Sequence, residues 1–299
     1  MGSGAEFYST QSRFSDPGAM GPWLDDTPGD LAAIRTIAST LVFHYMAYGD
    51  ITAHGFAPER RAEINLRYAD DMFARLHELD PAAPGAERKP TDRVVGCCRD
   101  HTLLFVAMAR HHGISARARV GFATYLIPDW ALDHVIAEVW DAAEGRWRLV
   151  EPQFPGDYTD PGDGATVDLL DVPRDRFLVG ADAWSACRSG ALDPERFVVA
   201  PDLPQPFLRS WAYLTHNLVF DLAALHKDEM ILWDLWGPLT MGRPKPDEST
   251  LDDLAAVLAE QHRALDRPVV PDTFDDLRVP AVVTSVTPPE FSPERVALR

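Results

Sequence analysis

The sequence has few basic residues, few cysteines and no long apolar run. Lys and Arg number 28 against 46 Asp and Glu, which gives a formal net charge of −18. Because such a surface repels phosphates on average, we expect neither a nucleic acid nor a membrane as partner. No stretch approaches the ~20 apolar residues of a membrane-spanning helix. Residues 1–7 lack the basic start and apolar run of a secretion signal, so we expect a cytoplasmic protein.

Cysteine is also scarce, with three residues in the chain: Cys97, Cys98 and Cys187. Neighbouring cysteines rarely pair with each other, so the sequence predicts free thiols. In a reducing compartment a free cysteine is either a small buried hydrophobe or a reactive group. Cys187 has no histidine or acidic motif beside it that points to chemistry, and we expect it to pack in the core.

What the chain does contain is typical of a folded globular protein: 46% apolar residues, with 8 Trp and 14 Phe. Length alone allows one large domain or two modest ones. Residues 1–25 are rich in Gly, Ser, Pro and Asp and are predicted to form a flexible arm. We expect a catalytic core with N-terminal helices over residues 26–200 and a helical, aromatic-rich accessory region over 201–299.

Apolar periodicity and turn residues predict the following elements. Helices are expected at Leu31–Tyr48, Pro58–Leu79, Thr102–His112 and Phe207–His226, with another beginning at Ser249 or Thr250, and strands at Ala116–Leu126, Val135–Trp140 and Trp147–Val150. The Pro-rich residues 268–299 are expected to add short surface strands. One buried helix followed by a run of strands is an α+β pattern, unlike the alternation that builds a parallel sheet.

Three residues in this region suggest nucleophilic catalysis. Cys98 precedes the buried helix, and a helix N-terminus and a nearby imidazolium are two ways to stabilise a thiolate. His134 opens one predicted strand and Glu151 ends the next. Two neighbouring antiparallel strands would hold this imidazole and carboxylate side by side, so that the carboxylate orients the imidazole.

Four motifs look like the core of the transglutaminase-like superfamily. They are Gly96–His101, His111–Arg117, Asp133–Trp140 and Trp147–Pro152, and the match that contains them runs from about Arg93 to Gln153, roughly a fifth of the chain. The resemblance implies a papain-like transglutaminase core, in which a buried helix bearing the nucleophile packs on an antiparallel sheet, with helices added at both ends.

Carried over residue by residue, the resemblance implies Cys98 as nucleophile, His134 as general base and then acid, and Glu151 as the residue that orients it. The family usually has aspartate at the third position, and glutamate is longer by one methylene. Asp133, Asp157 and Asp160 are therefore the alternative carboxylates.

The implied activity is acyl transfer from an amide or thioester of a peptide or small-molecule donor, through a thioester on Cys98. Water as acceptor would make the protein an amidase or peptidase, and an amine would make it a transamidase or an amide-forming enzyme. No cofactor or metal is implied. The alternative is a binding or scaffold protein that keeps the fold with an altered triad.

A zinc site is the competing use of the cysteines and histidines near the helix. Its candidates, Cys97, Cys98, His101, His111 and His112, lack a second pair of closely spaced ligands downstream. His111 and His112 more simply satisfy the last carbonyls of a helix.

Candidates for substrate contact are His101, Trp130, His216 and Asn217, with the loop Gln153–Gly164 as a lid. His101 is close to Cys98 in sequence, and His216 and Asn217 are polar breaks in an apolar helix. A packing role is the alternative for each, and the oligomeric state is left open.

Overall fold

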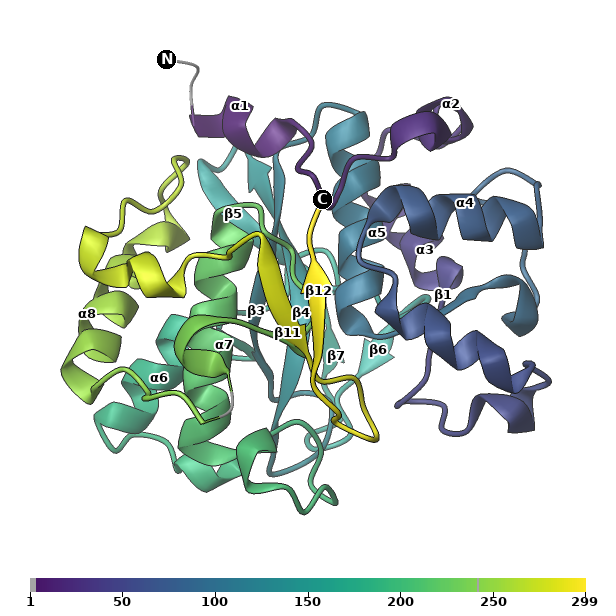
Figure 1. Ribbon diagram of the computed structural model, residues 1–299. Coiled ribbons are helices and arrows are strands. Elements are labelled where there is room, and N and C mark those ends of the chain that lie inside the picture. The colour runs from purple at the N-terminus through teal and green to yellow at the C-terminus, as the bar shows by residue number, and fades with distance from the viewer. Residues whose placement is uncertain (1–3, 241) are drawn as a thin grey trace. The chain divides into compact units, whose positions relative to one another are not determined.

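The computed structural model describes residues 4–240 and 242–299 (Figure 1). It is a mixed helix and sheet structure, as the α+β prediction required. The chain divides into two compact units, described separately below. The first unit comprises Met1–Ala118, Ile136–Tyr158 and Asp168–Val172, and the second comprises Arg119–Val135, Thr159–Val167 and Pro173–Arg299. The predicted division at residues 25 and 200 stays a prediction.

The first unit is mainly helical in its N-terminal part. Its α-helices are α1 (Gly4–Ser9), α2 (Gly21–Leu24), α3 (Leu31–Leu41), α4 (Ala69–Leu79) and α5 (Cys98–His111), with 3₁₀ helices at Gly18–Met20, Ile51–His54, Pro58–Asn65 and Pro90–Asp92. Strands β1 (Val42–His44) and β2 (Val94–Gly96) pair in parallel, and α5 packs against α3 and both of these strands.

Two helix predictions in this unit need correction. The helix that begins at Leu31 ends at Leu41, before the predicted Tyr48, because Val42–His44 leave it to form the ladder with Val94–Gly96. The helix predicted over Pro58–Leu79 is two pieces, a 3₁₀ helix at Pro58–Asn65 and α4 from Ala69. Strand pairing thus overrides the apolar period in the first case, and in the second the side chain of Arg99 on α5 donates to the carbonyls of Leu66 and Arg67, between the two pieces.

The start of the chain makes buried contacts. Tyr8 and Phe14 are buried, and the ring of Tyr8 lies edge-on to Trp147 with centroids 5.4 Å apart. The Gln11 side chain donates to the carbonyl of Ala107 on α5 at 2.9 Å. These contacts fasten residues 8–14 to the rest of the first unit.

The predicted run of strands is confirmed. The main sheet has the order β5-β4-β3-β8, with β9 paired to β4. Its strands are β3 (Ala116–Ala123), β4 (Ala131–Asp141), β5 (Arg146–Val150), β8 (Phe177–Val179) and β9 (Phe197–Val198). In the first unit β4 and β5 are antiparallel from Ala137↔Val150 to Asp141↔Arg146, so the strands that carry His134 and lead to Glu151 are neighbours. In the second unit β3 is antiparallel to β8, and β9 runs parallel to β4.

The second unit adds α6 (Gly180–Arg188), α7 (Ser210–Leu225) and α8 (Glu248–Ala259). The aromatic helix is confirmed as α7. The last helix begins at Glu248, earlier than predicted, because the side chain of Asp247 accepts from the Thr250 amide at 2.8 Å and caps it.

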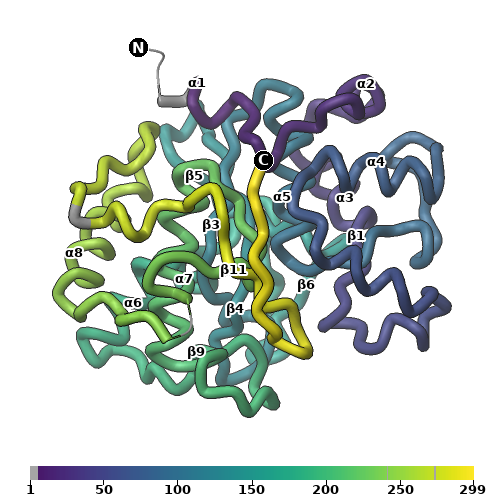
Figure 2. Tube along the Cα trace, viewed as in Figure 1, coloured from purple at the N-terminus to yellow at the C-terminus, as the bar shows by residue number. Residues whose placement is uncertain are grey.

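The Pro-rich C-terminal region contains short strands, as predicted. Figure 2 follows the chain to its C-terminus through β11 (Val282–Ser285) and β12 (Glu294–Ala297), which are antiparallel neighbours beside β10 (Asp234–Leu235). Two shorter strands, β6 (Tyr158–Thr159) and β7 (Thr166–Val167), form a separate pair. Across residues 4–240 and 242–299, every helix is too short or too polar to cross a membrane.

Candidate active site

Cys98 is the first residue of the 14-residue helix α5, so the predicted position at a helix N-terminus is confirmed. Cys97 caps the helix in an extended conformation, and its amide donates to Oδ2 of Asp100 at 2.8 Å. The Cys98 residue is 5% exposed. The nucleophile candidate therefore sits at the positive end of a buried helix.

Glycine at position 96 is required by this turn. A Cβ there would lie 2.4 Å from Oδ2 of Asp100 and 3.0 Å from Cγ1 of Val42. The first atom accepts the Cys97 amide and the second belongs to β1. Any larger residue at position 96 would push against the groups that place Cys98.

Asp100 and Arg99 form a buried pair at the same end of α5, and neither was singled out from the sequence. Arg99 Nη1 donates to Oδ1 of Asp100 at 3.0 Å, and its Nη2 donates to the carbonyl of Arg67 at 2.6 Å. Burial raises the pKa of the Asp100 carboxyl, although Arg99 and the Cys97 amide oppose this shift. The signal in the sequence was a charged pair at the start of an otherwise apolar helix.

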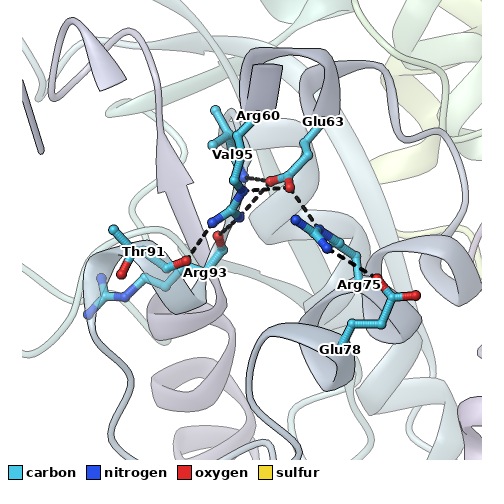
Figure 3. Close-up of polar contacts among 7 residues, drawn as sticks. All are labelled: Arg60, Glu63, Arg75, Glu78, Thr91, Arg93 and Val95. Atoms are coloured by element: carbon cyan, nitrogen blue, oxygen red, sulfur yellow. Dashed lines mark hydrogen bonds and ion pairs between the residues drawn. The ribbon is translucent and has the colours of Figure 1, made fainter. Parts of the chain in front are cut away.

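A second polar network supports β2, the strand that leads into Cys97 (Figure 3). The carboxylate of Glu63 accepts from Arg60 Nε at 2.7 Å, from Arg75 Nε at 2.9 Å and from the amide of Val95 at 3.0 Å. Burial raises the pKa of Glu63, but these three hydrogen bonds outweigh it and the pKa is lowered. Arg60 also donates to the carbonyl of Arg93 at 2.6 Å. The ionised Glu63 thus fixes the backbone on both sides of position 94.

The Cys97 thiol is buried beside Cys98 and Asp100. A hydrogen bond to the Cys98 side chain, burial and the Asp100 charge raise the pKa of the Cys97 thiol well above its usual range. Cys97 therefore keeps its proton.

His101 is one turn into α5 and faces the interior. Its Nδ1 donates to the carbonyl of Ala38 at 3.0 Å, and burial lowers the pKa of the imidazole to about 3. The charges of Glu151 and Cys98 act on His101 in the opposite direction, so these three residues of the first unit lie within electrostatic range. His101 is a neutral donor at physiological pH, which removes it as a source of an imidazolium.

Glu151 directly follows β5 and is fully buried. Its Oε1 accepts from the amide of Gln153 at 2.9 Å, and its own amide donates to Leu169 at 2.9 Å. Arg35 on α3 holds the loop that follows, through a 2.6 Å hydrogen bond to the carbonyl of Phe154. Burial lowers the pKa of Arg35, and the charge of Glu151 opposes that shift. The sequence analysis did not select Arg35 as a candidate. The feature that could have indicated it is a positively charged residue on the apolar face of a helix.

His134 lies on β4 in the second unit and is 2% exposed. The rings of Tyr125 and Phe177 stand edge-on to its imidazole, with centroids 6.5 and 6.4 Å away. Its neighbour Asp133, an alternative carboxylate, accepts from the Tyr213 hydroxyl at 3.0 Å and from Asn217. The aromatic rings restrict the plane of the imidazole.

The other two alternative carboxylates have different surroundings. Asp160 accepts from the Gly162 amide at 2.7 Å and from Arg176 Nη1 at 2.5 Å, which ties it to its own loop. Asp157 acts on Arg35 through its charge. Both carboxylates belong to the loop Gln153–Gly164, and each interacts with an arginine: Asp160 with Arg176 and Asp157 with Arg35.

The substrate-contact candidates outside α5 all have protein partners. Trp130 lies under the guanidinium groups of Arg196 and Arg209, at 5.7 and 5.9 Å from the ring centroid. His216 Nε2 donates to the carbonyl of Leu232 at 2.9 Å, and burial lowers the pKa of the imidazole to about 4. Their role in substrate binding stays a prediction.

Asn217 is likewise engaged. Its Nδ2 donates to the carbonyl of Gly121 and to Asp133, both at 2.9 Å. Among the described residues, three or more His, Cys, Asp or Glu side chains are nowhere grouped in a way that would hold a metal ion.

Residues 67–152 match the family described as the transglutaminase-like superfamily. This segment is transglutaminase-like. It contains Cys98, His134 and Glu151, and the resemblance drawn from the four sequence motifs is confirmed.

A solved structure from Cytophaga hutchinsonii, described as a "putative cysteine protease", aligns over 60% of this chain and 46% of its own length, at 16% identity and a TM-score of 0.37. The alignment thus spans less than half of that protein. No curated protein sequence matches this chain.

Proposed function

We propose that this protein is a cysteine-dependent acyl-transfer enzyme in which Cys98 is the nucleophile, His134 the general base and acid, and Glu151 the residue that orients the imidazole. The observation that carries the proposal is the position of Cys98, which begins a buried 14-residue helix inside a transglutaminase-like segment. That is the location where a thiolate is stabilised by unpaired amides and the helix dipole.

The chemistry is a two-step acyl transfer. The Cys98 sulfur forms a bond to the acyl carbon, and the tetrahedral intermediate collapses as the bond to the leaving nitrogen or sulfur breaks. His134 takes the proton of the Cys98 thiol and then delivers it to the leaving group. It then removes a proton from water or an amine, which attacks the thioester and releases the free thiol.

The fold that the resemblance implies is compatible with this mechanism. The resemblance implies a papain-like arrangement, in which the helix that bears the nucleophile packs on an antiparallel sheet. Glutamate at position 151 can still accept from an imidazole. The amide of Gln153 donates to its Oε1 at 2.9 Å, and this hydrogen bond fixes the rotamer of the side chain. The acyl donor is a peptide or small molecule.

The test compares Cys98→Ala with Cys187→Ala, since Cys187 is also a buried thiol but lies on α6. With p-nitrophenyl acetate as the acyl donor, we expect Cys98→Ala to lose roughly 10³-fold or more in the rate of p-nitrophenolate release, and Cys187→Ala to react like the native protein. Adding methylamine and measuring N-methylacetamide against acetate separates amide formation from hydrolysis. Equal rates for Cys98→Ala and the native protein would overturn the proposal and favour a binding protein that has kept the fold.

A further inference from the structure

Tyr45 lies beside the turn that carries the nucleophile. It follows β1 directly, and its amide donates to the carbonyl of Gly96 at 3.0 Å, which extends the parallel ladder by one hydrogen bond. Its side chain is buried, with 7% exposed, and the guanidinium of Arg61 lies 5.2 Å from its ring centroid. The backbone hydrogen bond and the contact with Arg61 together fix the position of the Tyr45 ring.

The phenol belongs to the same electrostatic environment as the thiols. It interacts with Cys97, Cys98 and Asp100, all within the first unit. Burial first, and the neighbouring Cys97 second, raise the pKa of Tyr45 well above its usual range. The hydroxyl therefore keeps its proton and can serve as a hydrogen-bond donor, while proton abstraction by a phenolate is excluded.

If Cys98 attacks an acyl group, negative charge develops at the turn with which Tyr45 pairs through the carbonyl of Gly96. The carbonyl oxygen becomes an oxyanion in the tetrahedral intermediate, and in Cys-His enzymes the amide of the cysteine supplies one donor to it. A neutral, buried donor with a fixed ring is suited to supply another, because it needs no reorganisation as the charge appears.

We propose that the hydroxyl of Tyr45 is the second donor of the oxyanion hole, acting with the backbone N–H of Cys98. This inference rests on the proposed function. The Tyr45 proton stays on its oxygen throughout, and the hydrogen bond strengthens as the acyl oxygen gains charge. Tyr45 thereby stabilises the transition state of acylation and has no part in ionising the thiol.

The experiment uses two reactions of the same sulfur. Acylation of Cys98 by p-nitrophenyl acetate passes through an oxyanion, whereas alkylation by iodoacetamide is a direct displacement at carbon that forms none. The variant is Tyr45→Phe, which keeps the ring against Arg61, and the control is Tyr48→Phe, three residues later and 51% exposed. Alkylation is followed at Cys98 alone by peptide mass spectrometry.

We expect Tyr45→Phe to slow acylation about 100-fold and to leave alkylation within about twofold of the native rate, while Tyr48→Phe changes neither. An equal fall in both rates would show that Tyr45 positions or ionises the thiol, and would overturn the oxyanion role. Unchanged acylation would overturn it as well. The Cys98→Ala background, measured in parallel, reports separately on the proposed function, which fails only if that variant still reacts.

Discussion

Helices α5 and α7 are both long and buried, and both carry polar residues, but the two helices use them differently. In α7, Asn217 and Asp221 point at neighbouring strands: Asn217 donates to the carbonyl of Gly121 on β3, and Asp221 accepts from Arg119 Nε at 2.9 Å and from the Val120 amide at 3.0 Å. In α5 the first turn carries Arg99 and Asp100, and Asp100 accepts from the amide of the residue before Cys98.

The difference shows that a polar break in an apolar helix has two physical meanings. In the middle of a helix, a buried charge must be matched by a partner, and the match fixes the helix to its neighbour. In the first turn, a carboxylate satisfies amides that the helix leaves unpaired and sets the conformation of the residues before it. A buried polar residue in the middle of a helix therefore has a fastening role, which means that it holds the helix to a neighbouring element. One in the first turn has a preparing role, which means that it sets the backbone conformation at a site.

The largest expected effect tests the fastening role of α7. Asp221→Ala leaves the guanidinium of Arg119 buried without its carboxylate, so we expect a loss of about 3–5 kcal/mol in the free energy of unfolding, measured by urea denaturation. The double variant Arg119→Met with Asp221→Leu removes both charges and should recover most of that loss. A loss below about 1 kcal/mol in Asp221→Ala would contradict a fastening role.

The next effect tests the preparing role of α5. Gly96→Ala puts a Cβ 2.4 Å from Oδ2 of Asp100, so we expect about 1–3 kcal/mol of destabilisation and about a tenfold slower alkylation of Cys98 by iodoacetamide. The matched control is Gly29→Ala, whose nearest neighbour would be His112 at an ordinary 3.5 Å. If Gly96→Ala alkylates at the native rate, the turn does not set the reactivity of the thiol.

The smallest effect concerns pH and compares one histidine from each helix. The pKa is about 3 for His101 and about 4 for His216, against 6.5 when unfolded. Because the folded state disfavours protonation, the stability that each neutral imidazole provides is complete above pH 6.5 and is lost as the pH falls towards these values. His101→Gln or His216→Gln should flatten the fall in stability between pH 6.5 and 4, measured by thermal unfolding. Curves parallel to that of the native protein would contradict the assignment.

Much of this could be predicted from the sequence because the signals were local. The buried helix with Cys98 at its start, the three strands and the aromatic helix followed from apolar period and turn residues. The end of α3 at Leu41 could not, since it depends on pairing with a strand about fifty positions later. Arg35 and Tyr45 were missed for the same reason: their partners, Phe154 and Gly96, are distant in sequence.

The catalytic assignment itself is tested most directly by mass spectrometry of an acyl adduct. The native protein is mixed with p-nitrophenyl acetate, quenched in acid and digested, and the peptide containing Cys97 and Cys98 is fragmented. We predict an acetyl group on Cys98, with its formation slowed in His134→Gln, while Cys97 is unmodified. An adduct on any other residue, or a rate of formation independent of His134, would contradict the account.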